Sequence, residues 1–383
     1  MSDVKLGAAG VYFPPFSNVV EGARRYEAEG LDFILQCDQL NLSIPRSIWT
    51  PDLVKAAETF DVDCWMDPWV CVSAAASCTD RIEFSAISDA MRRSPPNLAQ
   101  MALSMDHASS GRFTLVLGAG EHKQFGPYGL VRRKPFAHLE EATKIIKLLM
   151  DAEDTVDYDG PIWSLKDAVL PLGPYGDRPP PIIIAGGPGR SMEIAGRYAD
   201  GWLSYYPAAG DARWFAQGRD TVRNYAIEAG QDPDALEFYG TFLCLIGDTE
   251  DEATALTHNL ALRWDAAIMC PGGRSWQQWN PNNPPHPLGD DFHYTTDFVP
   301  MEWSREDALK ICEQVPPSVV RDSKFTGTPE QIADMVVPYI RAGMTHVLIA
   351  NYGQTVTTGD FGDIVANADL LNRTFKALRD RLE

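Results

Sequence analysis

Short apolar runs alternate with amphipathic stretches along nearly the whole chain. The runs have the length of buried strands, and the stretches between them repeat their apolar residues with the period of a helix. We expect strands at residues 5–9, 31–36, 82–87, 113–117, 181–185, 202–205, 237–246 and 346–350. We expect helices at residues 18–29, 97–108, 135–150, 191–199, 211–229, 250–262 and 364–382. A further helix starts at the capping box formed by Thr328 and Gln331, with Pro329 at its first position, and ends at Gly343.

This alternation gives about eight strand–helix units, which is the number that a closed parallel barrel needs. The sequence therefore predicts one (β/α)8 TIM barrel of the α/β class over residues 1–383, with an open doubly wound sheet as the structural alternative. Residues 157–178 and 269–315 break the rhythm, and the second stretch indicates a long insertion around 264–315. Long proline-rich loops form lids or pocket walls in many enzymes, but an ordered surface excursion without a direct role fits these stretches equally well.

Composition excludes several classes of protein. The chain has 383 residues, of which 45% are hydrophobic and 22% charged, as in ordinary globular proteins. Its formal net charge of −20 repels nucleic acids and anionic membranes and favours a soluble, cytoplasmic protein. No apolar run is long enough to span a membrane, and the first residues lead directly into a strand, so we expect no signal peptide. The cysteines are scattered without a CxxC pair, which indicates free thiols rather than disulfides or a zinc site.

The carboxyl ends of the predicted strands carry the candidate chemistry, because active sites of barrel enzymes lie there. Asp38 and Gln39 follow the second strand, and Ser88 ends the third. Glu121 follows the glycine-bearing segment 118–120 after the fourth strand and is a candidate acid or base. Each of these signals alone is also typical of an ordinary strand end or turn.

The fifth strand runs into the turn Ala185-Gly186-Gly187-Pro188-Gly189-Arg190, directly before a helix. Free backbone N–H groups and the helix dipole favour an anion at such a turn, so we predict a phosphate site there. The turn lacks the lysine of a P-loop and is no convincing Rossmann fingerprint. The histidines show no metal-ligand spacing, and no metal is expected. Among them, His122 is the best placed for a site at the barrel mouth.

Several of these segments, in this order, resemble the luciferase-like F420-dependent oxidoreductases. The resemblance lies in Asp106-His107-Ala108-Ser109-Ser110-Gly111-Arg112 with the segment 117–121, in the segments 186–188 and 195–202, and in Phe325-Thr326-Gly327-Thr328-Pro329-Glu330-Gln331. Within the family, the segments 45–48, 67–69, 127–129 and 286–292 are similar to phthiodiolone ketoreductase-like members. The resemblance implies a luciferase-like barrel, coenzyme F420 as hydride carrier, and, by family habit, a homodimer.

The F420-dependent glucose-6-phosphate dehydrogenases of this family supply a pattern for the site. It implies cofactor contacts at Asp38, Ser88, Ala119, Gly120, Gln124, Gly186, Gly187, Gly189 and Arg190. It also implies an active-site glutamate at Glu121. The bond between Ser85 and Ala86 matches the place where the family often holds a non-proline cis peptide against the cofactor ring, so both residues join the expected cofactor site.

The sequence departs from the family pattern in three places. Gln39 stands where the family has a catalytic histidine, and a glutamine is no general acid near neutral pH. Either Glu121, His122 or Asp38 then handles the proton, or hydride goes to an acceptor that is already electron-poor. Gln124 replaces an asparagine, and no lysine or arginine directly follows Trp202, so a sugar-phosphate substrate is not expected.

The basic segment 132–134 follows the fourth strand-end loop. It could hold the acidic tail of F420 or be a solvated charged turn.

These observations favour hydride transfer between the deazaflavin C5 and a carbonyl, an alcohol or an electron-poor small organic substrate. Trp49 and Trp276 are expected to line an apolar pocket for that substrate. Two alternatives stay open, namely an FMN-dependent monooxygenase and a barrel that binds a cofactor without catalysis.

Overall fold

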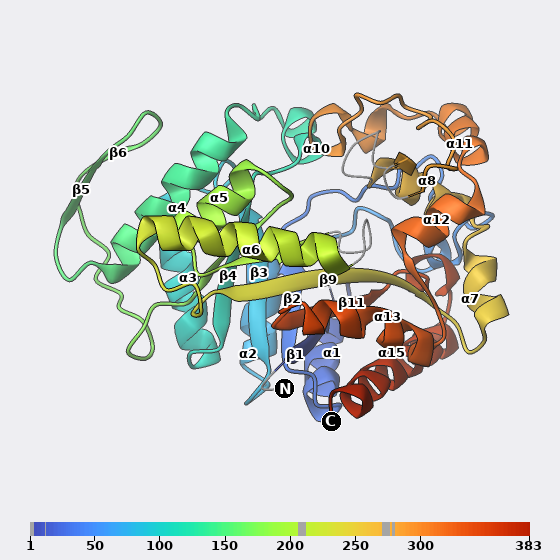
Figure 1. Ribbon diagram of the computed structural model, residues 1–383, viewed down its shortest axis with the longest axis horizontal. Coiled ribbons are helices and arrows are strands. Elements are labelled where there is room, and N and C mark those ends of the chain that lie inside the picture. The colour runs from blue at the N-terminus through green and yellow to red at the C-terminus, as the bar shows by residue number, and fades with distance from the viewer. Residues whose placement is uncertain (1–3, 12, 206–211, 270–275, 278–279) are drawn as a thin grey trace.

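The computed structural model describes residues 4–11, 13–205, 212–269, 276–277 and 280–383. A parallel barrel lies at its centre and helices surround it (Figure 1). The strands of the barrel are, in chain order, β1 Lys5–Ala9, β2 Phe33–Cys37, β3 Glu83–Asp89, β4 Phe113–Gly118, β7 Ile182–Ala185, β8 Gly201–Ser204, β9 Glu237–Ile246 and β11 His346–Asn351. Each pairs in parallel with its neighbours, and the pairings of β8 with β9 and of β11 with β1 close the ring. The predicted barrel is therefore confirmed.

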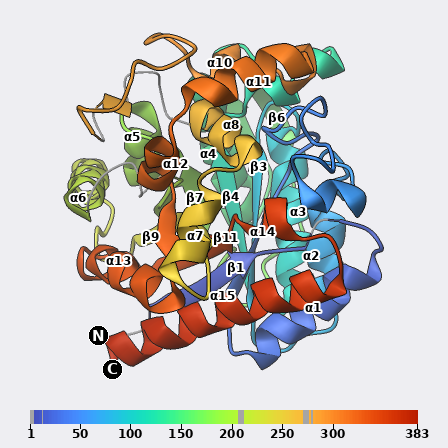
Figure 2. The same ribbon diagram turned by 90° about the vertical axis from the view of Figure 1, so that its right-hand side faces the viewer.

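The helices that cover the barrel begin with prolines or polar caps, as the sequence indicates. They are α1 Ser17–Ala28, α2 Pro68–Ala76, α3 Pro95–Ser109, α4 Pro135–Asp151, α5 Arg190–Tyr198, α6 Ala212–Ala229, α7 Glu250–Leu256, α13 Pro329–Arg341 and α15 Phe361–Leu382. The capping box of Thr328 and Gln331 is present at the start of α13. The last helix, α15, runs beneath the barrel beside α1 (Figure 2). None of the described helices is long and apolar enough to cross a membrane.

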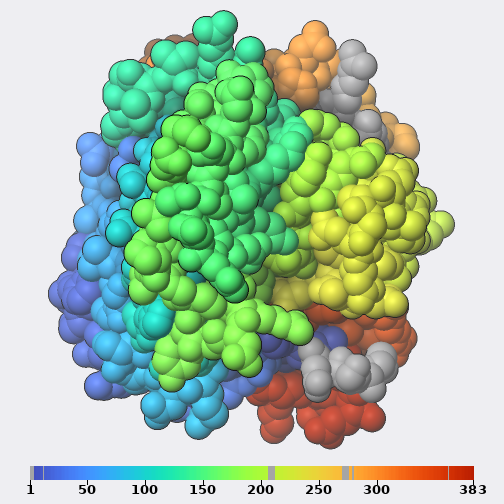
Figure 3. Space-filling model, turned by 90° about the vertical axis from the view of Figure 1, so that its left-hand side faces the viewer, coloured from blue at the N-terminus to red at the C-terminus, as the bar shows by residue number. Residues whose placement is uncertain are grey.

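Three smaller groups of elements lie outside this frame. Residues of the first irregular stretch form an antiparallel hairpin of β5 Val156–Asp159 and β6 Ser164–Ala168. The green part of the chain that contains this hairpin faces the viewer in Figure 3. The β2–α2 and β4–α4 loops contain the short helices η1 Lys55–Glu58, η2 His122–Gln124 and η3 Gly126–Tyr128. The region after β9 contains α8 Leu260–Ile268, α10 Tyr294–Asp297, η5 Pro300–Glu302, α11 Arg305–Gln314, α12 Pro317–Ser323, β10 Phe325–Gly327 and, after β11, α14 Gln354–Thr357.

Two predicted elements differ from the structure. The helix expected at 250–262 is two helices, because the side chain of Asn259 accepts hydrogen bonds from the backbone of Ala261 and Leu262 and starts α8 afresh. Helix α2 was not predicted, although Asp67 caps it and Pro68 follows. Asp211, where the sequence places the start of α6, lies outside the described residues.

The interior of the barrel is filled with side chains rather than open. Inward-facing residues of the strands form one cluster, which consists of Phe33, Leu35, Val116, Ile183, Leu203, Tyr239 and Leu348. The outward-facing residues pack against the helices in a larger core. Because side chains alternate along a strand, this division fixes which residue of each strand is the last to face inward at the mouth.

The insertion has a hydrophobic core of its own, which it shares with the long loop after β2. Ile44, Ile48 and Val54 of that loop pack with Trp264 and other residues of the insertion. Trp49 and Trp276 belong to this core and are 8% and 0% exposed. The prediction that these two tryptophans line a pocket is therefore wrong, because both side chains are buried against other apolar residues of this second core.

Candidate active site

The carboxyl end of the barrel carries a partly exposed apolar ring above the filled interior. The ring consists of partly buried residues that pack against the inward-facing cluster near the ends of five strands, namely Cys37, Ile87, Ala185, Ala350 and, just after β8, Tyr205. Sequence reasoning missed these residues. The alternation of each strand was the available signal, but it identifies them only once the strand registers are known. The ring offers an apolar floor on which a planar group can lie.

Asp38 follows β2 and is held from three sides. It is only 6% exposed and accepts hydrogen bonds of 2.7 Å from Ser88 Oγ and from Arg93 Nε. Arg92 Nη1 lies 3.4 Å from Asp38 Oδ1. Burial alone raises the pKa of the Asp38 carboxyl, but the Arg93 hydrogen bond and the charges of both arginines lower it below the ordinary value. Asp38 is therefore ionised in the folded protein and carries no proton that it could donate.

Gln39 takes part in a network that joins the β2 loop to η2. Its Oε1 accepts hydrogen bonds from Lys123 Nζ and from Gln124 Nε2, each at 2.5 Å. Both donors also contact the backbone oxygen of Asn41, at 2.8 and 2.9 Å. Asn41 Nδ2 in turn donates to the backbone oxygen of Lys123 at 2.8 Å. Neither Lys123 nor Asn41 was singled out from the sequence, because a lysine in a short polar segment is typical of a solvated turn.

Glu121 and His122 lie in the same loop after β4. The Glu121 side chain is 26% exposed, and its Oε2 lies 3.1 Å from Lys123 Nζ. His122 is half-buried, and its ring lies close to Gly126, where a Cβ would come within 3.0 Å of it. The structure thus brings Gln39, Glu121 and Gln124 together around Lys123.

Ser85 and Ala86 lie within β3 and not at its end. Both are buried, and both pair with residues of β2 and β4 on either side. The expected cis bond between them is wrong, since the cis peptide among the described residues joins Pro14 and Pro15. A cis bond would break the continuous parallel ladder that runs through this part of β3.

The glycine-bearing turn after β7 leads into α5 as predicted. Gly187 and Gly189 are exposed, and neither backbone N–H has a hydrogen-bond partner among the described residues. Gly189 precedes the helix with φ of 95°, a conformation that favours glycine. At Gly186 a Cβ would lie 2.3 Å from Ser191 Oγ, so only glycine fits there. The unpaired amides at a helix N-terminus suit a phosphate.

The guanidinium group of Arg190, which the sequence places among the cofactor contacts, is occupied by carboxylates in this structure. Its guanidinium pairs with Glu140 of α4 and, at 2.6 Å, with Glu193 of its own helix. Of the basic segment 132–134, Arg132 donates from Nε to the backbone oxygen of Gly120 at 2.9 Å and so holds the β4 loop. Arg133 and Lys134 are exposed. Ala119 and Gly120 are partly exposed, as a contact with a ligand requires.

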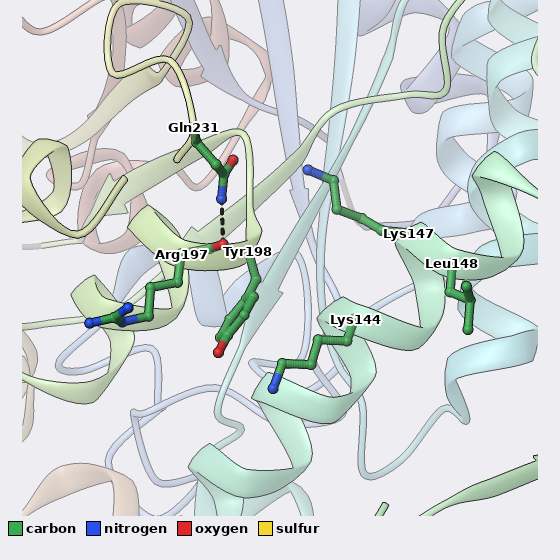
Figure 4. Close-up of a pocket in the computed structure, with 6 residues that line it drawn as sticks. All are labelled: Lys144, Lys147, Leu148, Arg197, Tyr198 and Gln231. Carbon is green, nitrogen blue, oxygen red and sulfur yellow. Dashed lines mark hydrogen bonds between the residues drawn. The ribbon is translucent and has the colours of Figure 1, made fainter. Parts of the chain in front are cut away.

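A hollow of about 360 Å³ lies elsewhere, on the outer face between α4 and α5 (Figure 4). Lys144 and Lys147 of α4 line it together with Arg197 of α5. Each of these cations is already paired with a carboxylate, at 2.6 to 2.7 Å. The hollow therefore shows no free charge for a ligand. Within the described ranges, no group of three or more histidine, cysteine, aspartate or glutamate residues is arranged to hold a metal ion.

Known proteins share this architecture and part of this sequence. The ketoreductase for phthiodiolone/phenolphthiodiolone dimycocerosates of Mycobacterium sp. (strain JLS) is 32% identical over 307 residues, which are 77% of each chain. An F420-dependent glucose-6-phosphate dehydrogenase of Kineococcus radiotolerans is 31% identical over 183 residues, which are 45% of this chain and 50% of that protein.

Solved structures agree in fold at low sequence identity. An F420-dependent secondary alcohol dehydrogenase in complex with an F420-acetone adduct superposes with a TM-score of 0.73 at 18% identity, covering 98% of this chain and 99% of that one. The oxygenating constituent of 3,6-diketocamphane monooxygenase from Pseudomonas putida, in complex with FMN, gives 0.63 at 17% identity and 98% coverage of both chains. A family model described as luciferase-like monooxygenase matches residues 2–346. The chain belongs to the luciferase-like monooxygenase family.

Proposed function

We propose that this protein is an F420-dependent oxidoreductase that acts on a carbonyl or alcohol group of a small organic substrate. One observation carries the proposal: the open turn at Gly187 and Gly189, with its unpaired amides, directly continues the strand whose Ala185 belongs to the apolar ring. A phosphate site and a floor for a planar ring therefore adjoin, as a ribityl-phosphate deazaflavin requires. The motifs shared with F420-dependent relatives support the same cofactor.

The residues at the mouth fit such a group. The amides of Gly187 and Gly189 would hold its phosphate, and the partly exposed residues Ala119 and Gly120 would contact its ring. When bound, the deazaflavin supplies a hydride donor or acceptor at C5. The apolar ring excludes water from one face of the site, which strengthens every polar contact made there.

The chain itself supplies polar groups of defined state around this floor. Asp38 stays ionised between its arginines and anchors the loop that carries Gln39. Glu121 faces the buried ammonium of Lys123 and keeps part of its carboxylate exposed, so it can accept a proton from an alcohol. A sugar phosphate does not fit this set, because no basic residue stands directly after Trp202, where Leu203-Ser204-Tyr205-Tyr206 follows.

An FMN-dependent monooxygenase is the second candidate. The FMN-bound monooxygenase with the same fold favours it, and FMN carries the same ribityl phosphate that the turn after β7 would hold. The two readings differ in the cofactor that binds and in the need for oxygen. A cofactor-binding barrel without catalysis is the third.

Titration of the purified protein with F420 and, separately, with FMN distinguishes these candidates. We expect saturable quenching of F420 fluorescence and oxidation of reduced F420 at 420 nm when ketones are added under nitrogen. Tight FMN binding with oxygen-dependent turnover, and no F420 binding, would overturn the proposal. Binding of F420 without turnover of any ketone, alcohol or nitroaromatic compound would favour the non-catalytic barrel.

A further inference from the structure

The orientation of the Gln39 amide is determined by its neighbours. The backbone N–H of Leu40 donates to Gln124 Oε1 at 2.7 Å, so the other end of the Gln124 amide must be its NH2 group. That NH2 group donates to Gln39. Lys123 can only donate, and it contacts the same atom. The atom is therefore the oxygen of Gln39, and its Nε2 lies on the other side of the amide.

Lys123 is placed to keep this orientation. The side chain is 1% exposed, and its Nζ contacts three oxygen atoms, those of Gln39, Asn41 and Glu121. Nζ donates hydrogen bonds to the oxygens of Gln39 and Asn41, and Glu121 Oε2 is its partner in an ion pair. An ammonium group has no acceptor capacity of its own, so it can contact only the oxygen of an amide in this way. Burial lowers the pKa of Lys123 and the charge of Arg92 acts in the same direction, whereas the charges of Glu121 and Asp63 raise it. On α10, which packs against η2, Asp297 accepts a hydrogen bond from the backbone of its own helix at His293 and is exposed.

The amide nitrogen of Gln39 is left for a ligand. Gln39 is partly exposed, and its Nε2 has no hydrogen-bond partner among the residues that the structure describes. The cation bound to its oxygen draws electrons from the amide and makes the two N–H bonds stronger donors. Gln39 lies two residues beyond Cys37, a member of the apolar ring, so its backbone lies at the mouth of the barrel.

We propose that Lys123 is a positioning residue that fixes Gln39 with its N–H groups toward the barrel mouth, where Gln39 binds the oxygen atom of a carbonyl or alcohol substrate. This inference rests on the proposed function. In reduction, the bound cofactor would supply the hydride for the new C–H bond, and the electron pair of the carbonyl π bond would move to the oxygen. Gln39 stabilises that charge by hydrogen bonding and gives up no proton, and the carboxyl group of Glu121, which accepts the proton in the reverse reaction, supplies the proton that completes the alcohol.

The decisive variant is Gln39→Glu. A glutamate keeps an oxygen for Lys123 and Gln124 but turns the donor that faces the substrate into a carboxylate oxygen. We expect the Tm to stay equal or rise, the Kd for F420 to stay within about threefold, and kcat for ketone reduction to fall by about 100-fold or more. If Lys123 and Gln39 were merely structural, kcat would remain unchanged in this variant.

Two further variants complete the series. Gln39→Leu removes both the donor and the acceptor, and should lower kcat to a similar extent and also lower the Tm. Lys123→Met frees the amide to turn and should lower kcat more than it weakens F420 binding. Gln314→Glu, an exposed glutamine on α11, is the matched control and should change neither kcat nor Tm.

The outcomes separate this inference from the proposed function. If the wild-type protein binds F420 and reduces ketones while Gln39→Glu does so equally well, the inference is wrong and the proposed function stands. If the wild-type protein reduces no ketone, the proposed function fails. In that case the Tm values still test whether Lys123 fixes Gln39. A Tm of Gln39→Glu clearly below that of the wild type would contradict this role of Lys123.

Discussion

The rings of Tyr239 and His346 stack with their centroids 3.9 Å apart and an interplanar angle of 9°, on the neighbouring strands β9 and β11. His346 is 4% exposed, its Nδ1 lies 2.9 Å from Thr345 Oγ1, and its Nε2 is buried without a partner in the described part of the chain. Burial, with a smaller effect of the Lys5 charge, lowers the pKa of His346 to about 3 from the ordinary 6.5. Burial therefore favours the neutral imidazole of His346 in the folded barrel.

This burial makes stability depend on pH. Because the folded pKa lies below the unfolded one, the stabilisation is complete above pH 6.5 and is lost as the pH falls toward 3. Between pH 7 and 4.5, His346 should cost about 2.5 kcal/mol of unfolding free energy. Urea unfolding of His346→Phe, which keeps an aromatic ring beside Tyr239, should show a pH dependence smaller by that amount. His258→Gln, at an exposed histidine, should keep the wild-type dependence, and an unchanged slope in His346→Phe would refute the assignment.

The ion pairs around Asp38 predict the effect of removing its charge. Asp38→Asn leaves Arg92 and Arg93 without their shared carboxylate in a mostly buried place. We expect a loss of about 2 to 3 kcal/mol in unfolding free energy, below the upper range for buried pairs because Arg93 is partly exposed. Glu306→Gln, at an exposed pair on α11, should change it by less than about 0.5 kcal/mol. Equal losses in both variants would show that the pairs at Asp38 are no more than surface pairs.

Two glycines of the turn after β7 should respond differently to substitution. Gly189 has positive φ, so Gly189→Ala should cost about 1 to 3 kcal/mol of stability through backbone strain. Nothing lies within 4 Å of a Cβ at Gly187, so Gly187→Val should leave the Tm nearly unchanged. The valine should nevertheless weaken F420 binding by about tenfold or more, because it covers the amides proposed for the phosphate. Unchanged F420 affinity in Gly187→Val, measured by calorimetry, would place the phosphate elsewhere.

A buried ion pair joins α8 to the segment between α12 and β10. Lys324 Nζ, next to β10, lies 2.6 Å from Asp265 Oδ2 on α8, and both side chains are almost fully buried. Lys324→Met alone should cost about 3 to 5 kcal/mol, because it leaves a buried carboxylate without its cation. The double variant Lys324→Met with Asp265→Leu should recover most of that loss. Chemical unfolding of four proteins, the wild type, both single variants and the double variant, measures the coupling, and additive losses would contradict it.

Local pattern was sufficient for the frame of the molecule. The barrel strands are apolar runs bounded by turns, and the capping box at Thr328 starts α13 where the sequence places it. Helix α2 was missed because Pro68–Ala76 is almost wholly apolar or small and shows no amphipathic period. The turn before α5 was predicted because its glycines and the start of the helix follow one another directly in the sequence.

The rest of the site depends on contacts between distant residues. Lys123 and Gln39 are 84 positions apart, and only the meeting of two strand-end loops makes the lysine a buried partner of the glutamine. Trp276 was assigned to a pocket because nothing in its neighbourhood in sequence indicates the core that it shares with the β2 loop. The order and register of the strands determine which loops meet at the mouth of the barrel. The local pattern of hydrophobic and polar residues does not specify that order or register.

The core that the insertion shares with the loop after β2 limits how the segment after β9 can be exchanged between related proteins. A designer who grafted the segment after β9 onto a related barrel would expose its tryptophans and phenylalanines, unless residues 42–62 were grafted with it. The two segments are one exchangeable module in space although some 200 residues separate them in the chain. Moving one segment without the other should therefore lower the stability of the hybrid protein.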